Sequence, residues 1–489
     1  MKKIRIIFST ILVSLLFLAS CDTAFESLST ESKTQDNASE LIYETVDHLN
    51  DEDEVVSTTA TVTGLTNPRV SFLEVPEYID GYFITEITFG AFEECRELES
   101  IKLSFVGEYA NSDTNGYLGY IFGAPSYIYN FDYVPSGLTL VTVTDETIVP
   151  DYCFKGCSNL ISAVFSESTT NIGKAAFSGC ENLKSISIPS GVTSIGHLAF
   201  CSSGLTSVTI PDNVKTIGQG AFMRCEDLML VVIPNSVSTI GWGAFKECTN
   251  LSTITVPNSV ASLEGTFLGC VNLTSVNMME GLKTLGNWTF HDCSSLESIS
   301  VPEGVTTIGD YTFSQCSNLK DVHLPNSVSS IGDYCFAECV NLNSVSLPSS
   351  LVTLGNATFA DCENMSSVSI AEGATSIEAF EFYGCENLTS ITIPDSVSNI
   401  GKAAFMKCIN LSSVIISKGV NVIEQNAFLG CCKLSKVCYC GDLESWGKIE
   451  VKGFNPELKP ELVFFYSENE PSEDGNFWRY VDGNVQIWQ

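Results

Sequence analysis

The chain has 489 residues, 20 of them cysteine, and carries 58 acidic against 24 basic side chains, a formal net charge of -34 at pH 7. Nucleic acid and anionic lipid headgroups both bind to cationic patches, and a chain this acidic repels them. The composition therefore excludes a nucleic-acid-binding protein and a membrane contact made by the folded surface.

The first residues have the layout of a secretory signal peptide. The basic start MKKIR precedes an apolar stretch that ends in LASC at residues 18–21. This apolar run is shorter than the ~20 residues that a membrane-spanning helix needs, which favours a cleaved signal over a span. The end of the stretch resembles the lipobox of bacterial lipoproteins. That resemblance implies removal of residues 1–20, acylation of Cys21, and membrane contact through this lipid anchor only.

From residue 21 to 75 we predict a lipidated cysteine followed by an acidic, flexible tether. The segment from Asp22 to about Ala60 is polar, lacks clear periodicity and contains the run DEDE at 51–54. Low hydrophobicity combined with high net charge is typical of segments that stay disordered.

A repeat of 22–23 residues occupies the chain from residue 76 to 440. One unit, LKSISIPSGVTSIGHLAF at 183–200, contains the pattern L-x-x-L-x-L of a leucine-rich strand, which Pro189 ends because proline has no N–H to donate to a sheet. Val192 and Ile195 follow at helix-like or turn-like spacing. A period of roughly 20–29 residues predicts a leucine-rich repeat solenoid of the α/β class, with about 14 stacked coils. The marker phenylalanines of these coils are Phe92, Phe154, Phe177, Phe200, Phe222, Phe245, Phe267, Phe290, Phe313, Phe336, Phe359, Phe382, Phe405 and Phe428.

Three stretches show the motif most fully: IPSGVTSIGHLAF (188–200), IPDNVKTIGQGAFMRCEDL (210–228) and IPDSVSNIGKAAFMKCINL (393–411). They fit I-P-x-x-V-x-x-I-G-x-x-A-F-x-x-C-x-x-L, and the array resembles the BspA-like leucine-rich repeats of bacterial surface proteins. The resemblance implies an exported, surface-anchored lipoprotein that acts in adhesion or recognition, with an extracellular protein or a glycan as partner. Ligands vary within that family, so the resemblance names no particular ligand.

One interval of the array is too long. Phe92 and Phe154 enclose an insertion near 104–142, whose core at 105–131 is rich in glycine, tyrosine and phenylalanine. Insertions in solenoids often map to loops on the binding face. They can equally pack back on their own coil as a structural elaboration, and the sequence leaves both interpretations open.

Thirteen of the cysteines stand three residues after a marker phenylalanine, and in the coil of Phe200 this place is taken by Ser203. Equivalent side chains of stacked coils point in the same direction, which opposes disulfide geometry. Cysteine also behaves as a small apolar side chain when buried. We therefore predict a buried ladder of reduced thiols that serves packing.

The segment CCKLSKVCYC at 431–440 holds four thiols in ten residues. Cys431 belongs to the ladder, which leaves Cys432, Cys438 and Cys440. Four cysteines can bind zinc, but the spacing is not the usual pair of C-x-x-C motifs. A local disulfide is the other alternative, and packing is the favoured interpretation.

Residues two and four positions after the repeat leucine should point out of each strand. They are mostly hydroxyl side chains, so this face is the candidate binding face, with a merely solvated sheet as the alternative. The candidate residues are Ser185, Ser187, Ser207, Thr209, Thr253, Thr255, Ser298, Ser300, Ser344, Ser346, Ser390 and Thr392.

Beyond Cys440 the period is lost, and aromatic residues crowd the segment 441–489. Solenoids need terminal caps, so we predict that this segment covers the last coil.

Nothing in the sequence indicates catalysis. The four histidines lie in different segments, and no nucleophile motif, phosphate loop or metal-spaced cluster accompanies them. We therefore expect no enzyme, cofactor or metal site. An interaction module is the leading hypothesis, and a passive structural spacer is the alternative.

Overall fold

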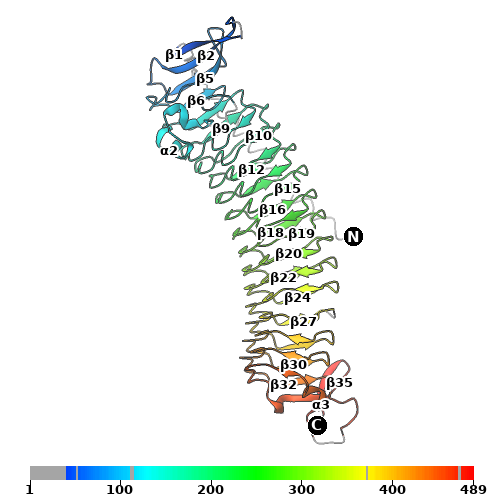
Figure 1. Cartoon of the computed structure of the whole chain (residues 1–489). Helices are drawn as coiled ribbons and strands as arrows, with labels where there is room; N and C mark the ends of the chain where they lie inside the picture. The colour runs from blue at the N-terminus through cyan, green and yellow to red at the C-terminus, as the bar shows by residue number, and fades with distance from the viewer. Residues whose placement is uncertain (1–39, 51–52, 111–114, 371–372, 472–474, 489) are drawn as a thin grey trace, which may run out of the picture.

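The computed structural model describes residues 40–50, 53–110, 115–370, 373–471 and 475–488. They form one elongated solenoid, with a small sheet at its N-terminal end and a β-hairpin at its C-terminal end (Figure 1). The signal peptide and Cys21 lie outside the described residues, as does the rest of the expected tether up to residue 39.

A ladder of parallel strands runs along one side of the solenoid. Alternation in each strand separates a buried from an exposed face: in the strand at 390–393, Ile391 and Ile393 are buried, while Ser390 and Thr392 are exposed. The strands of this ladder are β3 (Phe72–Val75), β6 (Ser100–Leu103), β7 (Leu140–Val143), β9 (Ser162–Phe165), β12 (Ser207–Thr209), β14 (Leu230–Val232), β16 (Thr253–Val256), β18 (Ser275–Met278), β20 (Ser298–Ser300), β22 (Asp321–His323), β24 (Ser344–Ser346), β26 (Ser367–Ser369), β28 (Ser390–Ile393), β30 (Ser413–Ile416), β32 (Lys436–Tyr439) and β34 (Val463–Tyr466).

A second ladder of two-residue parallel strands runs along another side. Its strands are β8 (Ile148–Val149), β10 (Asn171–Ile172), β11 (Ser194–Ile195), β13 (Thr216–Ile217), β15 (Thr239–Ile240), β17 (Ser262–Leu263), β19 (Thr284–Leu285), β21 (Thr307–Ile308), β23 (Ser330–Ile331), β25 (Thr353–Leu354), β27 (Ser376–Ile377), β29 (Asn399–Ile400), β31 (Val422–Ile423) and β33 (Glu450–Val451). The spacing of Val192 and Ile195 was compatible with a helix or a turn. In the structure this segment forms a turn followed by the short strand β11. The leucine-rich repeat class is confirmed, but the coils are β-structure with very little helix.

The marker phenylalanines and the thiols together form the core of each coil. Phe313 stacks on Phe290 at 5.5 Å and on Phe336 at 5.3 Å between ring centroids, with interplanar angles of 7°. The thiol of Cys316 donates a hydrogen bond to the carbonyl oxygen of Phe290 (3.2 Å), and that of Cys339 donates to Phe313 (3.1 Å). The thiol thus fills a small apolar space and also satisfies a buried carbonyl, which alanine could not do. The predicted burial of the thiol ladder is confirmed.

The ladder thiols should resist alkylation in the folded protein. Burial raises the pKa of Cys316 to about 12, and Cys316 is completely shielded from solvent. The thiolate is the reactive species, so iodoacetamide should modify Cys316 and Cys362 only after denaturation. Exposed Cys432 is the internal control and should react in the native state. Native labelling of Cys316 at the rate of Cys432, followed by mass spectrometry, would contradict the buried ladder.

The long interval between Phe92 and Phe154 contains an additional coil. The segment LTLVTV at 138–143 forms strand β7, in which Leu140 pairs with Ser100 of β6 and with Ser162 of β9. Leu138, Val141 and Val143 are buried like the leucine positions of other coils. The predicted insertion at 104–142 is therefore too long, because its last residues belong to the regular ladder.

The remaining extra residues pack back on the solenoid, as the structural-elaboration interpretation predicted. They form η2 (Leu118–Phe122), η3 (Tyr127–Tyr129) and α2 (Asn130–Tyr133). All five residues of η2 are buried. The buried side chain of Asn130 accepts from the backbone N–H of Gly119 (3.0 Å) and donates to the carbonyl of Lys155 (3.0 Å).

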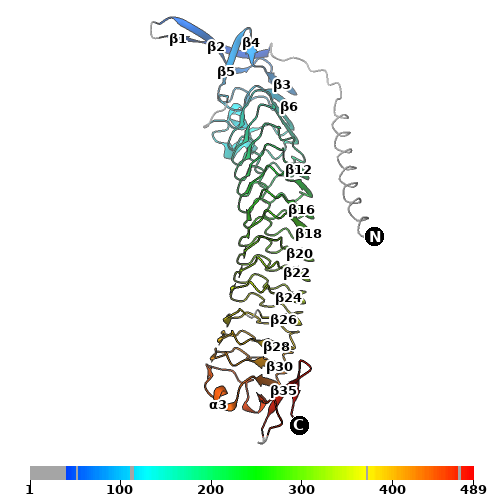
Figure 2. The same cartoon turned by 90° about the vertical axis from the view of Figure 1, so that its right-hand side faces the viewer.

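The expectation of a flexible tether up to residue 75 is wrong from Leu41 onward. Strands β1 (Leu41–Leu49) and β2 (Val55–Leu65) pair antiparallel, and β2 pairs in parallel with β5 (Tyr82–Ile87), which also pairs with β4 (Tyr78–Ile79). Ala60 and Val62 are fully buried, because the alternating stretch TATVT presents its apolar residues to the first coil. The β1–β2 hairpin projects from this end of the molecule (Figure 2).

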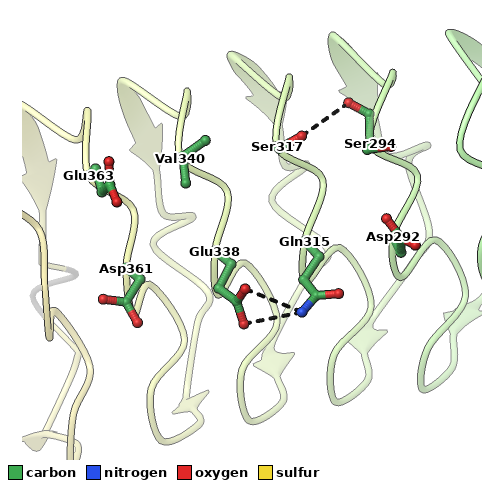
Figure 3. A pocket seen from close by; sticks show the side chains of 8 residues that line it. All are labelled: Asp292, Ser294, Gln315, Ser317, Glu338, Val340, Asp361 and Glu363. Atoms are coloured by element: carbon green, nitrogen blue, oxygen red, sulfur yellow. Dashed lines mark hydrogen bonds between the residues drawn. The ribbon is translucent and has the colours of Figure 1, made fainter.

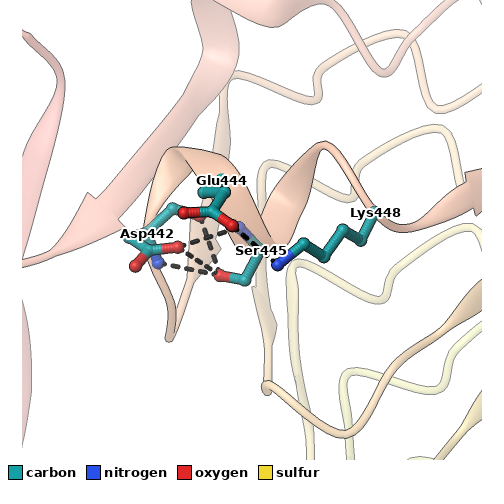
Figure 4. Close-up of polar contacts among 4 residues, drawn as sticks. All are labelled: Asp442, Glu444, Ser445 and Lys448. Carbon is teal, nitrogen blue, oxygen red and sulfur yellow. Dashed lines mark hydrogen bonds and ion pairs between the residues drawn. The ribbon is translucent and has the colours of Figure 1, made fainter.

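The C-terminal segment continues the solenoid before it ends. After α3 (Leu443–Trp446) and η4 (Pro460–Leu462), strand β34 extends the long ladder, and β35 (Phe477–Val481) and β36 (Asn484–Ile487) close it as an antiparallel hairpin. Trp478 is fully buried and donates its indole N–H to the carbonyl of Tyr439 (3.0 Å). Helix α3 begins with a capping box between Asp442 and Ser445, beside an ion pair of Glu444 with Lys448 (Figure 4). The arrangement is that of a cap over the last coil.

Candidate functional site

The exposed face of the long strand ladder carries the side chains singled out from the sequence. Parallel pairing in register stacks equivalent residues of successive coils: Ser344 lies beside Ser367, and Ser346 beside Ser369. Eleven of the twelve candidate residues are exposed, and Ser207 is half-buried. The structure therefore places these hydroxyl groups in two columns on one face, and some of the coils between them carry other residues there, such as Asp321 and His323.

Ser185 and Ser187 depart slightly from this regularity. They are exposed at the expected places between β9 and β12, but their coil is not part of a hydrogen-bonded strand ladder. The hydroxyl columns include this coil, although its backbone forms no strand at Ser185 and Ser187.

The coil of β14 interrupts the hydroxyl columns with two apolar side chains. Leu230 and Val232 of β14 are each 47% exposed, and the neighbouring Met229 is 57% exposed. In the ladder Ser207 pairs with Leu230 and Thr209 with Val232. A cluster of this kind on a polar face has no role in the core, and it is the most hydrophobic part of the candidate face.

The thiols cannot take part in surface chemistry, with few exceptions. Among the described residues all cysteines are free thiols, and most are buried. Of the C-terminal group, Cys438 is buried in β32, Cys440 is half-buried and Cys432 is exposed. No group of three or more histidine, cysteine or acidic side chains is placed to hold a metal ion within the part of the chain that the structure describes.

The histidines are not brought together. His48 lies on β1, where its Nε2 is 2.9 Å from the hydroxyl of Thr59, and His323 lies on the exposed strand face. His197 contacts the carbonyl of Gln219 through Nδ1 (2.9 Å). Among the described segments there is also no helix long and apolar enough to cross a bilayer.

A second feature, on the turns around the marker phenylalanines, was missed by the sequence analysis. Residues two positions after four successive markers line a groove of about 490 Å³, where Asp292, Gln315, Glu338 and Asp361 form one row (Figure 3). Ser294, Ser317, Val340 and Glu363 form the second row. Burial raises the pKa of both Asp292 and Asp361. The signal that could have revealed it is the recurrence of acidic or amide residues at this one repeat position.

Glu381 is the other residue that the sequence analysis passed over. It stands directly before marker Phe382, where neighbouring coils have Thr312, Cys335 and Thr358. The side chain is 2% exposed, and one carboxylate oxygen accepts from the backbone N–H of Glu378 (2.7 Å). Burial raises the pKa of Glu381 to about 8. It lines a small cavity together with apolar residues such as Leu351 and Ile370 and polar ones such as Ser376. We interpret Glu381 as a residue that affects stability.

The two ladders, the stacked phenylalanines and the cap define a leucine-rich repeat solenoid with an exposed strand face. The model of the BspA type leucine-rich repeat region matches the chain in six copies, over residues 147–266, 263–364 and 329–450. The chain belongs to this family.

Solved structures of leucine-rich repeat proteins resemble this chain. A protein from Bacteroides ovatus ATCC 8483 shares 26% identity with a TM-score of 0.62, over 85% of this chain and 98% of that one. A leucine-rich cell surface protein from Faecalibacterium prausnitzii A2-165 shares 22% identity with a TM-score of 0.37, over 88% and 100% of the two chains. The pneumococcal vaccine antigen PcpA shares 20% identity with a TM-score of 0.40, over 89% and 93%. None of the curated proteins matches the sequence.

Proposed function

We propose that this protein is an adhesion or recognition module of the bacterial cell surface, which contacts an extracellular protein or a glycan through the exposed strand face. The observation that carries the proposal is the pair of hydroxyl columns on that face, which the apolar cluster of Met229, Leu230 and Val232 interrupts. No catalytic role is proposed.

Hydroxyl groups both donate and accept hydrogen bonds, so the columns suit a ligand that presents many polar groups along its length. Each such contact is weak in water, and affinity would come from repetition along the coils. The exposed apolar cluster adds the desolvated contact that usually concentrates binding energy in an interface.

The passive spacer is the competing function, since an elongated solenoid also separates whatever lies at its two ends. It requires no ligand. A screen of the purified protein against arrayed glycans, extracellular matrix proteins and intact bacterial cells separates the two. Saturable binding to one class supports recognition, whereas the absence of binding across all three supports the spacer.

Export and anchoring form part of this proposal. The signal-like residues 1–20 and the lipobox-like LASC would place a lipid on Cys21 and hold the protein at the cell surface. A single anchor at one end leaves the strand face free along the whole solenoid.

Cys21→Ala should abolish lipid attachment, because no other thiol is available at the cleavage site. Metabolic labelling with an alkynyl fatty acid should mark the wild-type protein and not the variant. The variant should leave the membrane fraction. Cys432→Ala serves as the control and should be labelled like wild type. Continued labelling of the Cys21 variant would contradict the anchor.

A further inference from the structure

A row of aromatic side chains follows the groove along the turns of three successive coils. The Trp288 and Tyr311 rings stack at 4.2 Å with an interplanar angle of 10°, and the Tyr311 and Tyr334 rings stack at 4.9 Å and 3°. All three are only partly covered. We call these residues the aromatic ridge.

The backbone under the aromatic ridge is unfavourable for large side chains. Trp288, Tyr311 and Tyr334 have φ of 60°, 55° and 54°, in the left-handed region. The equivalent residues of three preceding coils are Gly220, Gly243 and Gly265, with φ of 59°, 60° and 56°. Bulky residues are rare in this conformation, because the side chain crowds the backbone. Glycine would serve the turn equally well, so the fold itself does not require the three rings.

The aromatic ridge and the acidic groove adjoin each other. His291 lies edge-on to Trp288, with ring centroids 4.8 Å apart. Burial lowers the pKa of His291, while the nearby charges of Asp292 and Glu338 act to raise it. Trp288 and His291 precede Asp292 in the same turn, so the first ring of the ridge and the first carboxylate of the groove lie on one turn.

Elsewhere on these turns the chain supplies its own cation to an aromatic ring. Lys155 lies over Tyr152 at 5.5 Å, Lys246 over Trp242 at 5.6 Å and Lys407 over Tyr383 at 4.9 Å from nitrogen to ring centroid. Along the aromatic ridge, no described lysine or arginine takes this place. Carboxylates and an amide line the adjoining groove instead: Asp292, Gln315, Glu338, Asp361 and Glu363.

We propose that the aromatic ridge and the acidic groove together bind a basic peptide segment of a partner protein. Arginine and lysine side chains pair with carboxylates and also bind to aromatic rings, which are the two groups that this surface offers. The amide of Gln315 donates to both carboxylate oxygens of Glu338 (3.2 and 3.3 Å) and orients this carboxylate. This site lies on the turns, away from the hydroxyl columns, and the inference is independent of the proposed function of the strand face.

A neutral sugar chain fits this surface less well. The carboxylates of the groove have no counterpart on a neutral glycan, whereas a guanidinium group satisfies a carboxylate with two hydrogen bonds.

The test uses the full chain and a fluorescent eight-residue peptide of alternating arginine and glycine, followed by fluorescence anisotropy. Asp292→Asn/Glu338→Gln/Asp361→Asn should weaken binding at least about tenfold, since each charge-assisted contact is lost. Tyr311→Gly/Tyr334→Gly should weaken it about threefold or more through loss of the ring contacts. The glycine variant keeps the backbone conformation found in other coils, and circular dichroism checks that it folds.

A charge-matched control is essential for so acidic a protein. Glu181→Gln/Glu226→Gln/Asp227→Asn removes three charges from another hollow of the solenoid, where Arg224 also lies. This control should bind the peptide within about twofold of wild type. Equal losses in the control and in the groove variant would overturn the proposal, as would full binding by the ring variant. Binding of chitosan oligosaccharide in the absence of peptide binding would overturn it as well.

Discussion

Replacing Phe313 by alanine is expected to lower the free energy of unfolding by about 3–5 kcal/mol, the usual cost of truncating a large buried aromatic side chain. Phe313 has no exposed surface and contacts the rings of Phe290 and Phe336 in the adjacent coils. The substitution leaves a cavity between two coils, and it removes both stacking contacts. Stability in a solenoid is the sum of coil and interface contributions, so the loss falls on one coil and its two interfaces.

Urea unfolding followed by circular dichroism measures this loss. Phe131→Ala is the matched control, since the Phe131 side chain is 62% exposed and should change stability by less than about 0.5 kcal/mol. Because repeat arrays can unfold in parts, the transition should be compared in shape as well as in midpoint. Equal stability of the Phe313 and Phe131 variants would contradict the stacked core.

Replacing Glu381 by threonine should stabilise the protein at neutral and alkaline pH. Burial raises the pKa of Glu381 from 4.5 to about 8 in the folded state, and the charge of Glu378 adds to the shift. A carboxyl group with a higher pKa in the folded state favours folding while it is protonated. Once it is ionised, its buried charge destabilises the folded state. The contribution of Glu381 to stability is therefore fully present below about pH 4.5 and is lost as pH rises through 8, by roughly 3–5 kcal/mol for a shift of this size.

Threonine is the natural substitute at this place. In the coil of Phe313 the hydroxyl of Thr312 donates to the carbonyl of Gly309 (2.7 Å), and Thr358 makes the same bond to Gly355 (2.7 Å). Urea midpoints measured at pH 5 and pH 8.5 give the test. The wild type should lose stability between the two values, and Glu381→Thr should lose much less. Glu363 is an exposed carboxylate in the preceding coil, and the variant Glu363→Gln should keep the pH dependence of the wild type. Parallel profiles for wild type and Glu381→Thr would show that Glu381 does not set the pH dependence.

The regular part of the fold was predictable because single residues recur at a constant spacing that equals the length of one coil. Phe313 and Cys316 recur with the period of the coil, and Phe313 stacks on its equivalents in the two adjacent coils. The outward direction of Ser344 and Ser346 followed from alternation in a strand. The hydrogen bond from each thiol to a phenylalanine carbonyl did not follow, since it depends on the turn geometry of the preceding coil.

The errors lie where the period is obscured. The strand of Leu140 carries the leucine pattern, but it was assigned to an insertion because the phenylalanine spacing around it is irregular. Strand β2 was taken for a tether because its buried apolar residues, Ala60 and Val62, lie among threonines. The aromatic ridge could not be predicted from one coil, because Trp288 and Tyr334 become neighbours of Tyr311 only when the coils stack.

Binding of an identified surface ligand by a strand-face variant tests the central claim most directly. Leu230→Ser/Val232→Ser removes the apolar cluster from the candidate face without touching the core, since both side chains are about half exposed. Val352→Ser is the control, as Val352 is 78% exposed and lies outside the strand ladder. We expect the affinity of the strand-face variant for the ligand to fall about tenfold, the effect of losing a hot-spot contact, and that of the control to stay at the wild-type value. Wild-type affinity in the strand-face variant, or an equal loss in both variants, would contradict recognition through this face.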